Sequence, residues 1–91
     1  MNKGELVDTV AAKTNITKKQ VDEVISAFLS VVTEAVANGD KVTLVGFGSF
    51  ERRERSEREG LNPKTKEKIK IPATRVPAFS AGKQFKEKVA P

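Results

Sequence analysis

The 91-residue chain has no cysteine, histidine, tryptophan or tyrosine. Without cysteine and histidine it lacks disulfides, thiolate metal sites and the commonest general base, so we expect no catalytic site, no metal and no cofactor. Five phenylalanines at core spacing are its aromatic residues, which argues against a platform for stacking single-stranded bases. Neither an apolar run near 18 residues nor a signal-peptide pattern is present in the sequence, so we expect a cytoplasmic protein without a membrane span.

The chain has little material for a hydrophobic core. Residues 51–76 carry nine of the 17 basic residues and few apolar side chains. Setting these 26 residues aside leaves 65, a size at which domains usually need a staple or a partner. Because disulfides are excluded, we expect a homodimer; a heterodimer with a paralogous subunit stays open as an alternative.

Charge is segregated along the chain. Residues 1–40 hold four basic and six acidic residues (net −2), whereas residues 41–91 hold 13 basic and six acidic residues (net +7). A basic field concentrated on one part of a molecule favours an anionic partner.

Helices are expected over residues 2–14 and 17–38, each opened by a pair of residues with capping-box spacing. These pairs are Asn2 with Glu5, and Thr17 with Gln20. In the second helix, which is itself about six turns long, the apolar residues form a continuous stripe. The stripe consists of Val21, Val24, Ile25, Phe28, Leu29, Val32, Ala35 and Val36. One short helix and a small sheet cannot cover it, so we expect its excess to pack against a second copy of the chain.

A short strand is expected over residues 42–45, which are rich in β-branched side chains. Gly46-Phe47-Gly48 follows, and we interpret it as a tight turn that directs Phe47 into the core. A phosphate-cradling loop would need more glycines and a following helix. The second strand begins at Ser49 and continues into residues 51–76.

Residues 51–76 have the pattern of a two-stranded arm with a turn at residues 60–64, where glycine and asparagine tolerate left-handed backbone. About ten residues per strand give an arm on the order of 30 Å long. A lone ribbon is marginally stable in water. We therefore expect the arm to be mobile until it lies against a partner.

Basic residues alternate along the expected strands of the arm. Lys64, Lys66, Lys68 and Lys70 would place four ammonium groups on one side of a strand, and Arg53 and Arg55 would share a face. Such regularity fits a polyanion. The alternation of Glu and Arg over residues 51–59 leaves open a merely solvated ribbon with weak ion pairs.

The C-terminal segment returns to the body through Pro72 and Pro77, which suit strand edges. Ser80 is predicted to cap a last helix over residues 81–89. The expected organisation is one domain, with a helical dimerisation base over residues 1–40, a sheet with the arm over residues 41–79, and a C-terminal helical segment over residues 80–91.

An ordered series of residues then adds a family resemblance. The series is Val45-Gly46-Phe47-Gly48-Ser49-Phe50, Arg55, Arg58, Gly60, Asn62-Pro63, Thr65, Ile69, Ile71-Pro72-Ala73, Val76-Pro77, Phe79 and Gly82-Lys83. It resembles the bacterial HU/integration-host-factor family of histone-like DNA-binding proteins, and HU most of all. The resemblance implies an α+β intertwined dimer with two N-terminal helices, a three-stranded antiparallel sheet extended into a β-ribbon arm, and a short C-terminal helix. Leu61 departs from the basic residue that many members carry there.

The same resemblance implies roles for individual residues. Pro63 would be the wedge between base pairs at the arm tip, and Asn62 would follow the minor groove. The other expected DNA contacts are Lys3, Arg53, Arg55, Arg58, Lys64, Lys66, Lys68, Lys70, Arg75, Lys83 and Lys86. The expected dimer core is Phe28, Leu29, Val32, Leu44, Phe47, Phe50 and Phe79.

The implied function is that of a nucleoid protein that binds, bends and compacts double-stranded DNA with little sequence specificity and prefers nicked or distorted duplexes. Its partners would be DNA and a second copy of itself, with no membrane and no small-molecule substrate. Three different functions stay open beside it: an enzyme, a basic module for RNA or an acidic protein surface, and a sequence-specific DNA-bending factor.

Overall fold

The computed structural model describes residues 1–90 as three helices and five strands. The elements are α1 (Lys3–Thr14), α2 (Lys18–Ala37), β1 (Val42–Leu44), β2 (Gly48–Arg55), β3 (Arg58–Leu61), β4 (Lys68–Ile71), β5 (Thr74–Ala81) and α3 (Lys83–Val89). The chain divides into two compact units, a helical unit over Met1–Glu34 and a second unit from Ala35 onward. The α+β class is confirmed, and both helices of residues 1–40 start and end within one residue of their predicted bounds.

Side-chain caps open both helices of the helical unit. Asn2 Oδ1 accepts a 2.9 Å hydrogen bond from the backbone N–H of Glu5, which is one half of the predicted capping box. The reciprocal bond from Glu5 is not found among residues 1–90. The box of α2 is complete, because Thr17 and Gln20 each accept a bond from the other's backbone N–H, at 3.1 and 3.3 Å. Helix starts are therefore well encoded locally.

The core of the helical unit is small. Val7 and Ala11 of α1 and Val21 of α2 are buried, and Val10 and Ile25 pack against them. Much of the predicted α2 stripe stays exposed in the single chain. Val24 is 63% exposed, Leu29 51% and Phe28 41%. Such a contiguous apolar surface on a helix is characteristic of an association surface.

Two residues that follow α2 in the chain, Gly39 and Arg52, lie at its C-terminal end. Gly39, which follows the helix, has a left-handed φ of +85°, a conformation common just beyond a helix end. Arg52 Nη1 donates a 3.2 Å hydrogen bond to the Ala37 carbonyl, one of the acceptors that a helix end leaves free. Arg52 thus has a structural partner at the base of the arm.

The three-stranded antiparallel sheet has the order β1-β2-β5. In its register Phe50 lies opposite Phe79, and Gly48 lies opposite Ala81. A side chain on Gly48 would approach the Ser80 carbonyl oxygen and the Phe79 ring to about 2.5 Å, so this close strand contact requires glycine.

The aromatic residues of the second unit form one cluster. Phe47 stacks on Phe85 of α3 with ring centroids 5.0 Å apart, and Phe79 lies 4.9 Å from Phe50 and 5.4 Å from Phe47. Phe47 and Phe79 are still 46% and 41% exposed. The predicted turn does carry Phe47 onto a hydrophobic cluster, but the single chain leaves that cluster partly open.

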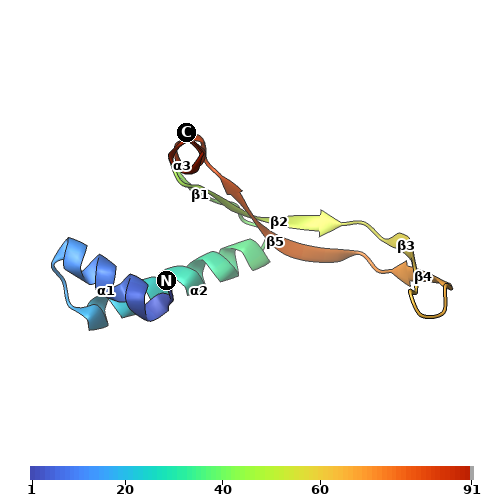
Figure 1. The fold of residues 1–91 in the computed structure, drawn as a ribbon, viewed down its shortest axis with the longest axis horizontal. Coiled ribbons are helices and arrows are strands. Elements are labelled where there is room, and N and C mark those ends of the chain that lie inside the picture. Colours follow the sequence, from blue (N-terminus) through green and yellow to red (C-terminus); the bar gives the residue numbers. More distant parts are fainter. Residues whose placement is uncertain (91) are drawn as a thin grey trace. The chain divides into compact units, whose positions relative to one another are not determined.

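The predicted arm is present, with a break that the sequence pattern did not indicate (Figure 1). Strands β2 and β5 pair as far as Arg55 opposite Thr74, and pairing resumes with Arg58 of β3 opposite Ile71 of β4. Pro72 lies in the gap and has no N–H to donate to a ladder. We call β3, β4 and the connecting residues 62–67 the outer ribbon.

Three local predictions were wrong. The turn is not at residues 60–64: Gly60 lies within β3, and the chain reverses over residues 62–67 with Lys66 as the left-handed residue at φ 58°. Lys64 and Lys66 therefore lie in this turn, so only Lys68 and Lys70 share a strand face. Ser80 lies within β5 and does not cap α3, whose N-cap is Gly82 without a side-chain hydrogen bond.

The sequence also predicted that no segment of the chain spans a membrane. Within residues 1–90, no helix is long and apolar enough to cross a bilayer.

Candidate nucleic-acid interface

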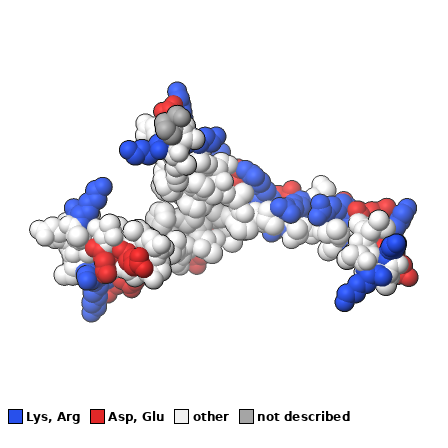
Figure 2. All heavy atoms as spheres, in the orientation of Figure 1, with Lys and Arg blue, Asp and Glu red and all other residues white. Residues whose placement is uncertain are grey.

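The arm presents basic side chains along both of its strand pairs and around its tip. Figure 2 shows blue Lys and Arg atoms along the arm, interleaved with red carboxylates, and further blue side chains at its end. The predicted DNA-contact residues on these elements are Arg53, Arg55, Arg58, Lys64, Lys66, Lys68, Lys70 and Arg75, and all of them are exposed. The arm therefore offers a polyanion many solvent-accessible cations.

Strand register divides these cations between two faces. Arg53 and Arg55 share one face of the β2–β5 pair, as predicted, because alternate residues of a strand point the same way. Arg75 lies opposite Glu54 and so belongs to the other face. A ligand seated on one face of this segment meets the first two, and a ligand that wraps the ribbon meets all three.

Carboxylates hold several arm cations in the free chain. Arg53 is 3.1 Å from Glu51, and Arg75 is 3.7 Å from Glu54, which also lies 3.7 Å from Arg52. In the outer ribbon Lys70 is 3.1 Å from Glu57. Such exposed pairs stabilise a protein by only about 0–1 kcal/mol each. A phosphate can therefore replace the glutamate at little cost.

Arg53 makes three side-chain hydrogen bonds in the free chain. Its Nη2 donates to Glu51 Oε1 at 3.1 Å and to Ser80 Oγ at 3.0 Å, and its Nε donates to the same carboxylate. Ser80 thus orients an arginine, a role that the sequence pattern did not indicate because it favoured a helix cap at Ser80. The cross-strand register that brings Ser80 near Arg53 is a tertiary feature.

The tip turn is built on Asn62. Its backbone N–H donates to the Glu67 carbonyl at 2.9 Å, its carbonyl accepts from the Lys66 N–H at 2.7 Å, and its side-chain oxygen accepts from the Lys64 N–H at 2.9 Å. With its backbone and side-chain oxygen engaged in this way, Asn62 holds the loop that presents the exposed Pro63.

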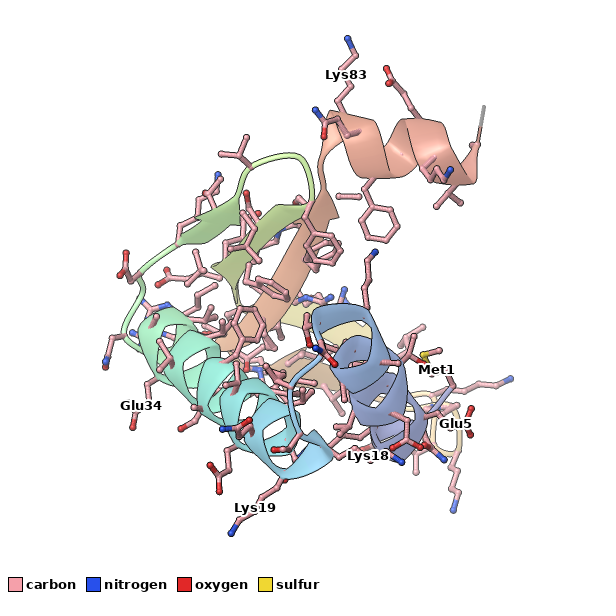
Figure 3. All side chains as sticks on the ribbon, turned by 90° about the vertical axis from the view of Figure 1, so that its left-hand side faces the viewer. Met1, Glu5, Lys18, Lys19, Glu34 and Lys83 are labelled. Carbon is pink, nitrogen blue, oxygen red and sulfur yellow. The ribbon has the colours of Figure 1, made fainter. Side chains whose placement is uncertain are left out.

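The remaining predicted contacts belong to the body. In the helical unit Lys3 donates to Ser26 Oγ at 2.8 Å and lies 3.4 Å from Asp22. In the second unit Lys83 begins α3 and lies 3.9 Å from Glu87, and Figure 3 shows its side chain pointing away from the helix. Lys86 on the same helix is exposed.

The predicted dimer-core residues are incompletely buried in the single chain. Val32, Leu44 and Phe50 are half-buried, while the aromatic rings and helix residues described above remain more exposed. Leu61, outside both predicted sets, is 66% exposed near the arm tip.

Known proteins match this chain over its whole length. The family model described as "Bacterial DNA-binding protein" matches residues 1–90. DNA-binding protein HU of Nostoc is 72% identical over 91 residues, which is 100% of this chain and 97% of the relative. DNA-binding protein HU of Synechocystis is 66% identical over 97 aligned positions, covering 100% and 97% of the two chains.

Solved structures agree with the sequence matches. The cocrystal structure of Anabaena HU with DNA is similar with a TM-score of 0.94 and 72% identity, and the match covers 100% of this chain and 99% of that one. HU from Thermotoga maritima has a TM-score of 0.70 and 39% identity, with 98% of each chain covered.

Proposed function

Since this chain belongs to the HU family of bacterial DNA-binding proteins, we propose that it is a histone-like nucleoid protein that binds and bends double-stranded DNA with little dependence on base sequence. The observation that supports this most directly is the arm, a two-stranded ribbon of exposed cations that ends in an exposed proline. Anabaena HU, at 72% identity, has been crystallised with DNA.

Cations of the arm supply the affinity in this mechanism. Lys and Arg neutralise phosphates and release the counterions condensed on the duplex, so binding weakens steeply as salt rises. The glutamates paired with Arg53, Arg75 and Lys70 are displaced by phosphates as the arm engages. Contacts of this kind hold the backbone and carry no direct sequence information.

The outer ribbon supplies the bend. Minor-groove binding is the known mode of this family's architectural proteins, and that groove presents nearly the same hydrogen-bonding pattern for A·T and T·A pairs. Pro63 enters between two base pairs and unstacks them, at a cost of a few kcal/mol per step. Nicked, gapped or kinked DNA has less stacking to lose, so it binds more tightly.

Two arms require two chains. The exposed stripe of α2 and the partly open aromatic cluster support a homodimer. Its shared core would consist of Phe28, Leu29 and Val32 of α2 together with Leu44, Phe47, Phe50 and Phe79 of the second unit. Burying these side chains against a second copy removes their apolar surface from water, at about 25 cal/mol per Å². The dimer would act on the nucleoid in the cytoplasm.

The body extends the DNA path beyond the arms. Lys3, Lys83 and Lys86 add phosphate contacts from outside the arm and so strengthen the salt dependence of binding. Lys3 exchanges its contacts with Asp22 and Ser26 for a phosphate at that point. The proposal involves no catalytic step and no cofactor.

A salt-series titration tests the function. Intact duplexes of unrelated sequence and one nicked duplex carry donor and acceptor dyes at their ends, and energy transfer reports how closely the ends approach. We expect the ends to approach on binding, similar affinities among the intact sequences, and tighter binding to the nick. One intact sequence that outcompetes the others by orders of magnitude would favour a sequence-specific bender.

A competition experiment separates binding to duplex DNA from binding to RNA or to an acidic protein surface. Duplex RNA and an acidic polypeptide are added to the preformed DNA complex at matched charge concentration. We expect duplex DNA to be retained. Absence of duplex binding even at low salt, with tight binding to either competitor, would contradict the proposed function.

A further inference from the structure

Leu61 is an apolar side chain presented at the end of a basic arm. It is the last residue of β3, is 66% exposed, and lies opposite Lys68 in the register. Strand alternation places it on the face that carries Glu59, Lys68 and Lys70. An exposed leucine in this position contributes little to the stability of the free protein.

The other apolar residues of the outer ribbon lie on its opposite face. Ile69 pairs with Gly60, and a Cβ built on Gly60 would be 3.0 Å from Ile71 Cδ1. Ile71 therefore covers the Gly60 backbone and has a packing role within the ribbon. Leu61 lies on the polar face, where burial has to come from a ligand.

The fold of the tip is independent of the Leu61 side chain. The turn is held by the backbone and side-chain hydrogen bonds of Asn62, to Glu67, Lys66 and Lys64. Leu61 and Pro63 flank Asn62 in the chain, so the hydrogen bonds of Asn62 hold the backbone of both residues in place. Lys68 opposite Leu61, and Lys64 beside Pro63, are exposed and available to phosphates.

We propose that Leu61 is a second apolar contact residue of each arm, which enters the DNA groove beside Pro63 and provides affinity that does not depend on salt. This inference rests on the proposed function. Leucine is among the side chains that architectural proteins insert between base steps. Its burial releases water rather than counterions, so its contribution should be the same at every salt concentration.

The test compares Leu61→Ala and Leu61→Lys with the unmodified protein in a salt series on one duplex. For Leu61→Ala we expect affinity to fall on the order of ten-fold at all salt concentrations, with an unchanged slope of log K against log salt. For Leu61→Lys we expect the slope to steepen by about 2 per dimer, because two added cations each release about 0.9 counterion. Leu61→Lys should then bind relatively better at low salt and worse at high salt.

A fluorescent base analogue at the bent step gives a second reading that a general loss of charge would not change. We expect Leu61→Ala to lower the fluorescence increase that accompanies unstacking, while Lys64→Ala leaves it nearly unchanged at saturation. Val45→Ala is the matched control, since Val45 is 98% exposed but lies outside the arm, and it should bind like the unmodified protein. Circular dichroism checks that each variant is folded.

The outcomes separate the role of Leu61 from the function of the protein. If the unmodified protein binds and bends DNA but Leu61→Ala has the same affinity and fluorescence, the role of Leu61 is wrong and the function stands. A change in slope for Leu61→Ala would likewise overturn an apolar contact. If the unmodified protein does not bind duplex DNA, the proposed function fails first and the role of Leu61 with it.

Discussion

The helical unit and the outer ribbon are built on opposite principles. The helical unit buries Val7, Ala11 and Val21 and closes its helix starts with side-chain caps. The outer ribbon has strand and turn hydrogen bonds, an Ile71 side chain over Gly60, and exposed charges. A ribbon of this kind is marginally stable alone. We therefore expect substitutions of buried residues in the helical unit to lower stability, and substitutions of exposed residues in the outer ribbon to lower the proposed DNA affinity.

Leu29→Glu should have the largest effect, on the helical side of the comparison. A carboxylate placed in a buried dimer core without a partner costs on the order of 4 kcal/mol. We expect loss of the dimer in sedimentation equilibrium, and loss of DNA bending with it. Ser30→Glu, on the exposed polar side of the same helix, is the matched control and should remain dimeric. A dimeric Leu29→Glu variant would place the subunit interface elsewhere.

Val21→Ala should lower stability without changing binding. Val21 is 2% exposed, and removing two buried methyl-sized groups should lower the free energy of unfolding by about 2 kcal/mol. Chemical denaturation gives this value, and a titration at low temperature, where the variant remains folded, should give unchanged DNA affinity. Weakened affinity of the fully folded variant would show that the two regions are energetically coupled.

Pro63→Ala should do the opposite of Val21→Ala: it should weaken DNA binding and bending without changing stability. Without the proline wedge the base step stays stacked and the DNA bends less, so the ends should approach each other less closely. Less bent DNA contacts less of the protein, so affinity for intact duplex should fall about ten-fold. Denaturation should be unchanged within about 0.5 kcal/mol, as is usual for an exposed residue. Full bending by Pro63→Ala would mean that Pro63 is only a turn residue.

Glu54→Gln should have the smallest effect. It tests whether ion pairs within the arm compete with phosphate for the arm's arginines. Glu54 lies 3.7 Å from both Arg52 and Arg75, so its neutralisation frees Arg75 for a phosphate. We expect affinity to rise a few-fold at low salt, with the gain disappearing at high salt. Glu23→Gln makes the same charge change in the helical unit and serves as the control. Equal gains for both variants would point to net charge rather than to this ion pair.

Much of the fold was predictable because its signals are local. The capping box of Thr17 and Gln20, the Asn2 cap and the apolar stripe of α2 depend on residues within a few positions of one another, and they are found in the structure. The ordered residue series led to the family, which the full-length matches support.

The tip turn shows where local signals were insufficient. Gly60 and Asn62 both tolerate left-handed backbone, so the sequence pattern favoured a turn between them. The observed turn lies further along because Asn62 bonds to Lys64, Lys66 and Glu67, and this arrangement draws two of the four alternating lysines out of the strand. The position of the turn was therefore decided by the whole set of Asn62 hydrogen bonds, which spans residues 62–67, rather than by the backbone preference of any one residue.

The amino-acid sequence by itself determined the helices, the basic arm and the apolar stripe that one chain cannot cover, since composition and spacing are properties of the chain alone. Tertiary structure decided which side chains of the arm lie next to one another. It placed Ser80 beside Arg53, Glu54 between Arg52 and Arg75, and Leu61 on the lysine face of the outer ribbon. These neighbours are set by strand register, because a shift of one residue turns every side chain of a strand to the other face.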